Sequence, residues 1–172
     1  MQNFQEFLEN SLQQNIKKLV PLTGGASADI NRIILENNNE LIVRRSLSKE
    51  QSVMAVPKKL EAKIQRIVKS NDAPVPEIIF EFSEHGDIGE GYVMEAIPGE
   101  TIPRKILRDD KYKNVRSKLS FEIGRSLATI HQTKLDELTD LDSVTFEESL
   151  KKLYLVYSSF EQPQPVFELA FK

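Results

Sequence analysis

Hydrophobic side chains near the start of the chain recur at intervals of three and four residues. They are Phe4, Phe7, Leu8, Leu12, Ile16 and Leu19. This spacing follows the 3.6-residue period of a helix, and proline cannot continue a helical hydrogen-bond ladder. The sequence therefore predicts an amphipathic helix that ends before Pro21.

From residue 19 onward, short apolar runs separated by turn residues replace this pattern. Runs at 30–35 and 41–43 follow the turn residues Gly24-Gly25 and Asn37-Asn38-Asn39. This alternation predicts three antiparallel strands between residues 19 and 43. A second hairpin is predicted from the runs at 78–82 and 92–95, which flank a polar loop containing glycines.

Helical spacing returns twice further along. Pro57 suits the first turn of a helix with an apolar stripe at Leu60, Ile64, Ile67 and Val68. After Pro98-Gly99 the pattern is helical throughout, with apolar stripes at 119–130 and 146–156 and the first turns of another helix at 166–172. The predicted fold class is α+β, in which a five-stranded antiparallel sheet with one inserted helix precedes an all-helical segment.

The boundary between these two parts is placed after residue 97, giving regions 1–97 and 98–172. The final apolar segment has no capping residue or polar tail, so we expect the chain to stop inside a helical element. An incomplete helical lobe would leave apolar surface uncovered, which predicts self-association or a partner chain.

Composition narrows the class of protein. Net charge is -3, from 23 basic and 26 acidic residues without long runs of either sign, so neither nucleic acid nor an anionic membrane is an expected partner. The chain has no cysteine and two histidines, so we expect no disulfide and no thiolate or histidine-rich metal site. No stretch approaches the roughly 20 apolar residues of a membrane span, and a soluble cytoplasmic protein is predicted.

Two adjacent glycines, Gly24 and Gly25, lie between the first two predicted strands. Glycine tolerates positive φ and close backbone approach, so the N–H groups of Gly24, Gly25, Ala26 and Ser27 are candidates for phosphate contacts. A simple hairpin turn explains the same glycines, so the loop does not decide the function by itself.

A cation on the third predicted strand strengthens the phosphate hypothesis. Alternation along a strand puts Ile42 and Arg44 on one face, where an apolar side chain able to cover a base lies beside a charge able to reach its phosphates. Arg45 points to the other face, where we expect it to be solvated. Glu61, on the flank of the helix stripe, is predicted to face the sheet and to pair with Arg44; an exposed glutamate among lysines is the alternative.

The segment after the fifth predicted strand is the candidate for base recognition. Tyr92 to Gly99 reads as a strand that leaves the sheet as an extended linker, and unpaired backbone groups there are able to bind an adenine edge. Met94 and Ile97 would contact the faces of the ring. Alternatively, Met94 is a core residue and Pro98-Gly99 is only a turn.

Six segments, in their order and spacing, resemble the aminoglycoside phosphotransferase family of protein-kinase-like enzymes. They are Leu22–Ser27, Leu41–Arg44, the helix bearing Glu61, Ala73–Pro76, Tyr92–Gly99 and Gly124–His131, and the resemblance runs from about residue 19 to 135. It implies a kinase-like N-lobe in which residues 24–27 cover phosphates, Arg44 contacts them, Glu61 orients Arg44, and Glu95 and Ile97 offer backbone contacts to adenine. The chain looks closest to the branch with kinase-like domains fused to acyl-CoA dehydrogenases, where arginine commonly replaces the lysine of the strand.

The catalytic half of such an enzyme is not found in the sequence. Family members carry His-Gly-Asp with an asparagine five residues after the aspartate, and a later aspartate that binds metal. His85-Gly86-Asp87 has the first three residues, but Tyr92 stands in the asparagine position, so we interpret the triplet as a turn. His131, at the end of a predicted helix, is assigned a packing or capping role. No catalytic or metal-binding residue is predicted.

The sequence therefore favours the nucleotide-binding portion of an ATP-dependent small-molecule phosphotransferase, with Mg²⁺ in the complete enzyme. The acceptor would be an unknown hydroxyl compound, with a slight preference for a hydroxyacyl compound from the branch resemblance. The alternative is a non-catalytic kinase-like interaction module that forms a homodimer through its uncovered helical surface. A third reading is an α+β protein whose glycines only make turns.

Overall fold

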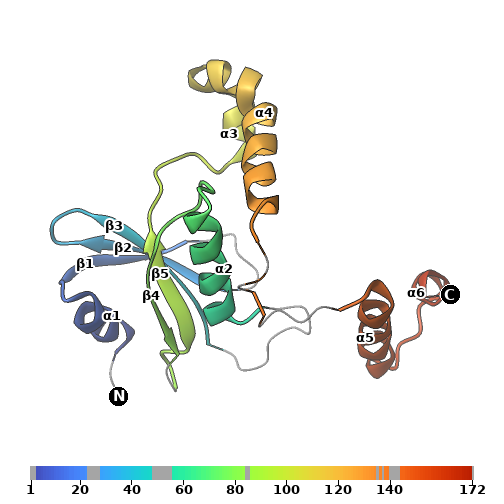
Figure 1. Ribbon diagram of the computed structural model, residues 1–172. Helices are drawn as coiled ribbons and strands as arrows, with labels where there is room; N and C mark the ends of the chain where they lie inside the picture. Colours follow the sequence, from blue (N-terminus) through green and yellow to red (C-terminus); the bar gives the residue numbers. More distant parts are fainter. Residues whose placement is uncertain are drawn as a thin grey trace.

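The computed structural model describes residues 3–22, 28–47, 56–83, 86–134, 136, 138–139 and 144–171. Five antiparallel strands form one sheet with the spatial order β1-β2-β3-β5-β4 (Figure 1). The strands are β1 (Ile16–Pro21), β2 (Asp29–Leu35), β3 (Glu40–Ser46), β4 (Ile78–Ser83) and β5 (Glu90–Glu95). The last strand in sequence is inserted beside β3, which puts β5 inside the sheet and β4 at its edge.

Helices precede, interrupt and follow the sheet. They are α1 (Phe4–Leu12), α2 (Lys58–Ser70), α3 (Pro103–Arg108), α4 (Lys113–His131), α5 (Phe146–Ser159) and α6 (Pro165–Ala170), with a 3-10 turn, η1 (Asp110–Tyr112), between α3 and α4. The α+β fold class is confirmed, with a single helix inserted between β3 and β4 and helices after β5. It is consistent with a kinase-like N-lobe followed by helices.

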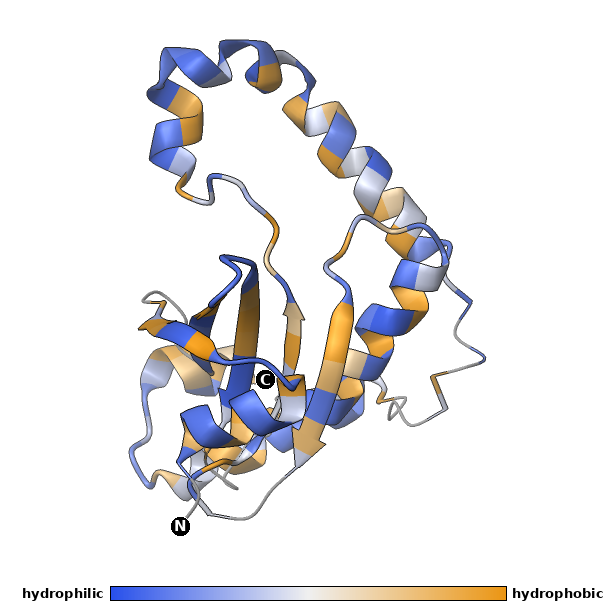
Figure 2. Cartoon of the chain, turned by 90° about the vertical axis from the view of Figure 1, so that its left-hand side faces the viewer, coloured by the Kyte–Doolittle hydropathy of each residue, from blue (hydrophilic) through white to orange (hydrophobic). Residues whose placement is uncertain are grey.

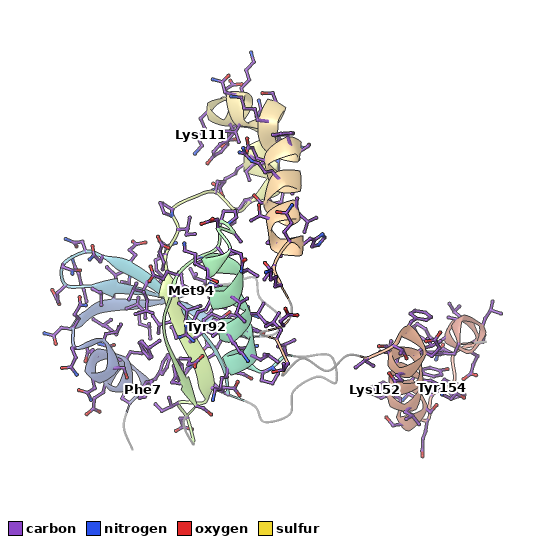
Figure 3. The ribbon with its side chains drawn as sticks, in the orientation of Figure 1. Phe7, Tyr92, Met94, Lys111, Lys152 and Tyr154 are labelled. Carbon is purple, nitrogen blue, oxygen red and sulfur yellow. The ribbon has the colours of Figure 1, made fainter. Side chains whose placement is uncertain are left out.

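The sheet separates two hydrophobic layers. On one face, α1 contributes Leu8 to a core that also contains Ile33, Val43 and Val93, all fully buried. On the other face, α2 packs on β4 and β5, and Ala62 meets Tyr92 there. Figure 3 shows Phe7 on the α1 side, and Tyr92 and Met94 in the layer between the sheet and α2.

The predicted first helix is wrong beyond Leu12. Gln13 takes a left-handed conformation (φ 54°) that ends α1, and the chain continues as β1 from Ile16. The misleading spacing has a cause, because the register moves from Ile16 opposite Leu35 to Lys18 opposite Ile34. This β-bulge puts Ile16 and Leu19 on the same face of the strand although they are three residues apart, which imitates a helical period.

The hairpin between β4 and β5 contains the His-Gly-Asp triplet. His85 lies outside the described residues, but Gly86 (φ 78°) and Asp87 form a turn, as predicted, and Ile88 is buried. The backbone oxygens of Asp87 and Ile88 accept hydrogen bonds from Arg45. Gly86 and Asp87 are therefore part of the β4–β5 hairpin turn.

The helices after β5 keep much apolar surface exposed. Ile123, Leu127 and Ile130, which form the predicted stripe of α4, are all exposed, and Leu155, Val166 and Leu169 of α5 and α6 are more exposed still. Figure 2 shows hydrophobic and hydrophilic residues mixed along α4. His131 is the last residue of α4 and its side chain is exposed, so of the two roles expected for it packing is wrong, whereas a basic residue in the last turn is consistent with capping. No helix in the described part of the chain is both long and apolar enough to cross a membrane.

Substitution of Gly91, on β5, tests how closely this strand packs against its neighbours. A Cβ atom at Gly91 would lie 2.5 Å from the backbone oxygen of Arg44 and 2.6 Å from the Phe82 ring, so the sheet would have to shift. We expect Gly91→Ala to lower the free energy of unfolding by about 1–3 kcal/mol, as overpacking does. Gly124→Ala is the matched control, because nothing lies within 4 Å of its Cβ and alanine favours helix α4, so it should raise stability. Urea denaturation measures both, and equal effects would contradict the packing described here.

Candidate functional site

A cation from the sheet and a carboxylate from α2 meet on the face opposite α1. In the β3–β5 ladder, Ile42 lies opposite Met94 and Arg44 lies opposite Tyr92, so all four side chains share this face. Arg44 Nε donates a hydrogen bond to Glu61 Oε2 at 3.0 Å. The predicted ion pair between Arg44 and Glu61 is confirmed.

Glu61 accepts two further hydrogen bonds that the sequence analysis did not predict. Lys58 Nζ donates to Oε1 at 2.6 Å, and the Tyr92 hydroxyl donates to Oε2 at 3.2 Å. The i,i+3 spacing of Lys58 and Glu61 on one helix was a usable signal for the first bond. Nothing in the sequence indicated the second, because only the sheet register brings Tyr92 under α2.

Arg44, Lys58, Glu61 and Tyr92 form a cluster that is largely buried, and burial affects the pKa of Glu61. The Lys58 side chain is 6% exposed, and those of Arg44 and Glu61 are 25% and 24% exposed. Burial alone raises the pKa of Glu61, but hydrogen bonds and positive charge from Lys58 and Arg44 outweigh it and lower the pKa below its ordinary value. Glu61 is therefore a carboxylate at neutral pH.

The same environment raises the pKa of Tyr92, whereas it lowers that of Glu61. Burial, followed by the negative charge of Glu61, raises its pKa to about 12. The hydroxyl therefore keeps its proton at neutral pH and remains a hydrogen-bond donor. With Tyr92 neutral, two cations face one carboxylate, which leaves the cluster with one net positive charge.

Arg44 has donor capacity left over. Within the described part of the chain it bonds only through Nε, and its terminal nitrogens Nη1 and Nη2 have no hydrogen-bond partner. A guanidinium with an open pair of terminal nitrogens matches the oxygens of a phosphate or carboxylate. The position is therefore chemically suited to an anion.

The linker after β5 offers backbone groups beside the cluster. Met94 packs on the Ala62–Tyr92 layer, and its sulfur is 3.8 Å from Gln65 Nε2. The N–H of Glu95 is already donated to the Glu77 carbonyl at 2.9 Å, so of the two backbone groups of Glu95 only its carbonyl remains a candidate for ligand binding. Ile97 is exposed and makes no backbone hydrogen bond to any described residue.

The predicted glycine loop, with Gly24, Gly25, Ala26 and Ser27, lies outside the described residues. Its flanks are described: the N–H of Leu22 donates to the carbonyl of Ile30 at 2.8 Å, and Ile30 lies opposite Arg44 in the β2–β3 ladder. The two ends of the loop are therefore attached to the sheet next to the strand position of Arg44.

Arg45 does not behave as expected from the sequence. Its side chain is 13% exposed, its Nε pairs with Asp29 Oδ2 at 2.7 Å, and its guanidinium lies 3.5 Å from the centre of the Phe4 ring. With its bonds to the β4–β5 turn, Arg45 ties α1, β2 and the hairpin together. The prediction of a solvated side chain is wrong, because β3 lies in the interior of the sheet and α1 covers this face.

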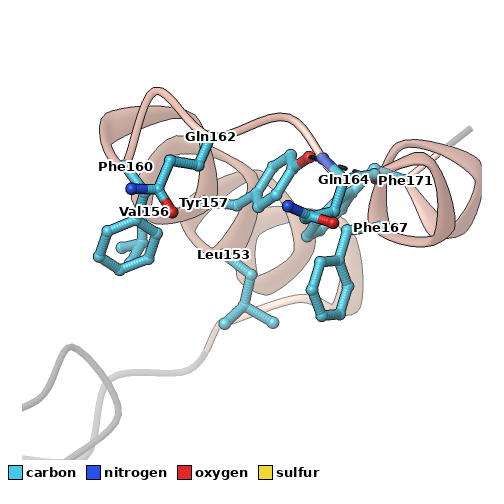
Figure 4. A pocket seen from close by; sticks show the side chains of 8 residues that line it. All are labelled: Leu153, Val156, Tyr157, Phe160, Gln162, Gln164, Phe167 and Phe171. Carbon is cyan, nitrogen blue, oxygen red and sulfur yellow. Dashed lines mark hydrogen bonds between the residues drawn. The ribbon is translucent and has the colours of Figure 1, made fainter.

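A second concave surface lies between α5 and α6. It is a cavity of about 430 Å³ whose lining is mostly aromatic and aliphatic (Figure 4). The Tyr157 hydroxyl fixes the turn between the helices, because it donates to Glu168 at 2.9 Å and accepts from the N–H of Gln164 at 2.7 Å. The described residues that line this surface include no charged side chain, so it suits an apolar partner better than a nucleotide.

Comparison with known proteins gives an independent assignment. The family model described as the phosphotransferase enzyme family matches residues 18–169, which is most of the chain. No curated protein sequence matches this chain. Since the matched region covers nearly all of the sheet, α2 and the helices that follow, the chain belongs to the phosphotransferase enzyme family.

Proposed function

We propose that residues 1–97 bind a nucleoside triphosphate, with Arg44 as the phosphate contact and Glu61 as the residue that orients it. The observation that carries this proposal is the Arg44 guanidinium, held by its Nε while both terminal nitrogens lack a partner among the described residues. A charged group kept in place without using its forked end is prepared for an anionic ligand.

The neighbouring groups fit a base attached to those phosphates. Ile42 and Met94 lie opposite each other on the face that carries Arg44, and apolar side chains there would cover a purine ring. The carbonyl of Glu95 and the N–H of Ile97 would bind its edge, while Gly24, Gly25, Ala26 and Ser27 would cover the phosphates. We therefore assign ATP as the ligand, with residues 98–172 forming a separate helical part.

Transfer of the phosphoryl group is assigned to the family and not to any residue of this chain. The described residues contain no group of three or more histidine, aspartate or glutamate side chains that could hold a metal ion, and we derive no step through Mg²⁺. The acceptor would be a small-molecule hydroxyl compound. The branch with acyl-CoA-dehydrogenase fusions remains our proposal for the nearest relatives, and it favours a hydroxyacyl acceptor.

A second function is favoured by the exposed apolar surface of the later helices. Phe160 and Phe167 both line the α5–α6 cavity and are 64% and 53% exposed. Exposed aromatic side chains around a cavity are typical of a protein contact. The alternative function is therefore a kinase-like module that pairs with a second copy through α5 and α6.

Removal of the Arg44 side chain tests nucleotide binding. We expect Arg44→Ala to weaken Mg-ATP binding about 10- to 100-fold, because charge-assisted hydrogen bonds contribute about 1.5–3 kcal/mol each. Isothermal titration calorimetry measures the affinity. Arg125→Ala is the control, since Arg125 is an exposed arginine on α4 that pairs with Glu122 of the same helix. Equal affinity of Arg44→Ala and the unsubstituted chain would reject the proposal.

The proposal also requires Glu61 to be ionised, so the contribution of Glu61 to the free energy of unfolding should depend on pH. Because the folded-state pKa of Glu61 lies below its ordinary value of 4.5, its stabilising contribution is full above that value and is lost as the pH falls through the lowered pKa. We expect Glu61→Gln to reduce the free energy of unfolding by about 2–4 kcal/mol at pH 7, and by less at pH 3. Urea denaturation at both pH values measures this difference.

Glu81→Gln is the control for that experiment, because Glu81 pairs with Arg66 on the surface and should contribute about 1 kcal/mol or less. A Glu61→Gln effect that stays the same at pH 3 would show that the Glu61 charge does not stabilise the fold.

Light scattering separates the two functions. A dimer, with twice the 19.7 kDa mass of the chain, whose stability is indifferent to ATP would support the interaction module. In that case Phe160→Ser should weaken dimerisation at least about tenfold, because its ring lines the cavity. Phe146→Ser is the matched control, as Phe146 is 76% exposed on the same helix but outside the cavity lining. A chain that stays monomeric at high concentration would reject the dimer.

A further inference from the structure

The hydrogen bonds to Glu61 use nearly all of the acceptor capacity that faces Arg44. A carboxylate has about four lone-pair sites, two on each oxygen. Arg44 Nε and the Tyr92 hydroxyl both donate to Oε2, at 3.0 and 3.2 Å, and Lys58 Nζ donates to Oε1 at 2.6 Å. Oε2 is therefore saturated, and Oε1 is already bound to an ammonium group.

This occupancy restricts how Arg44 binds. An arginine and an unoccupied carboxylate commonly pair through two parallel N–H···O bonds, one to each oxygen. Here the second bond would have to reach Oε1, where Lys58 lies, or share Oε2 with Tyr92. Arg44 instead makes one bond through Nε, and neither terminal nitrogen is engaged by the described residues.

We propose that Tyr92 and Lys58 are positioning residues of the nucleotide site, which occupy Glu61 so that Arg44 keeps both terminal nitrogens for a phosphate. This inference rests on the proposed function, since it assigns a use to the nitrogens that the pairing leaves open. The shape of the guanidinium supports it, because Nη1 and Nη2 together present a fork that fits two phosphate oxygens.

Both positioning groups are held firmly enough for this role. Lys58 begins α2 one turn before Glu61, and its side chain is 6% exposed, so burial and the helix together fix its ammonium group. Tyr92 is 4% exposed between β5 and α2, in the layer that contains Ala62. The high pKa of Tyr92, about 12, keeps its hydroxyl protonated, so the donor does not switch off in the physiological range.

A purely structural role for the Tyr92 hydroxyl makes a different prediction. If the hydroxyl only satisfies its own need for a partner, its removal should leave the Arg44 geometry unchanged. If it restricts Arg44, its removal frees a site on Oε2, and Arg44 should rotate into a two-bond pair with Glu61. The state of the Arg44 side chain therefore distinguishes the two roles without reference to nucleotide.

The experiment uses Tyr92→Phe, which removes one oxygen and keeps the buried ring. Nitrogen-detected NMR of the arginine side chains, with the Arg44 signals assigned by their loss in Arg44→Lys, reports rotation about the Cζ–Nε bond. We expect one averaged Nη signal for Arg44 in the unsubstituted chain and two separate signals in Tyr92→Phe. Mg-ATP affinity, measured by calorimetry, should fall about 3- to 10-fold with the partial loss of one charge-assisted bond.

Lys58→Met provides a second variant, in which Oε1 is freed instead, and the same splitting and loss of affinity are expected. Tyr154→Phe is the control, because Tyr154 lies on α5 and makes no contact with the cluster; it should change neither readout. Circular dichroism establishes that each variant is folded before it is compared.

Two outcomes would overturn the inference, and they are distinguishable. Unchanged Arg44 signals in folded Tyr92→Phe and Lys58→Met, with intact Mg-ATP binding by the unsubstituted chain, would refute the positioning role and leave the proposed function standing. Absence of Mg-ATP binding by the unsubstituted chain would refute the proposed function and, with it, the use assigned to the terminal nitrogens.

Discussion

The Glu61 carboxylate is the constraint on which the site depends, because it joins three parts of the fold through one group. It connects β3 through Arg44, β5 through Tyr92 and the start of α2 through Lys58. Burial of a carboxylate is unfavourable unless its hydrogen bonds are satisfied, and here Arg44 Nε, the Tyr92 hydroxyl and Lys58 Nζ donate to its two oxygens. The position of α2 on the sheet is consequently fixed by polar contacts as well as by Ala62 and its apolar neighbours.

The two arginines at adjacent positions of β3 show how a strand divides its roles. Arg44 faces α2, and its terminal nitrogens have no partner among the described residues. Arg45 faces α1, and its guanidinium contacts Asp29, the Phe4 ring and the carbonyls of the β4–β5 turn. Alternation along the strand is sufficient to separate them. Arg45 therefore holds the first helix and the hairpin in place, while the terminal nitrogens of Arg44 stay open on the other face.

The helices after β5 bury fewer of their apolar residues than the sheet does. The sheet has a buried layer on each face, whereas the large apolar residues of α4, α5 and α6 are mostly exposed, and some of those of α5 and α6 line the α5–α6 cavity. The family assignment covers both regions, since it extends from residue 18 to residue 169. Nucleotide binding is therefore proposed for the sheet and α2, and the alternative, contact with a second copy, is proposed for α5 and α6.

The sequence alone determined the α+β class, the two hairpins and helix α2, because these follow from local period, turn residues and strand alternation. It left the Arg44–Glu61 pair as one of two alternatives, and the packing of α2 on the sheet decided for the pair. It failed where tertiary contacts set the outcome. The bulge between Ile16 and Lys18 gave a strand the spacing of a helix, and α1 converted Arg45 from an expected solvated residue into a bridge. Only the register of β5 beside β3 placed the Tyr92 hydroxyl on Glu61, because residues 31 positions apart meet through sheet pairing and helix packing, which no local pattern records.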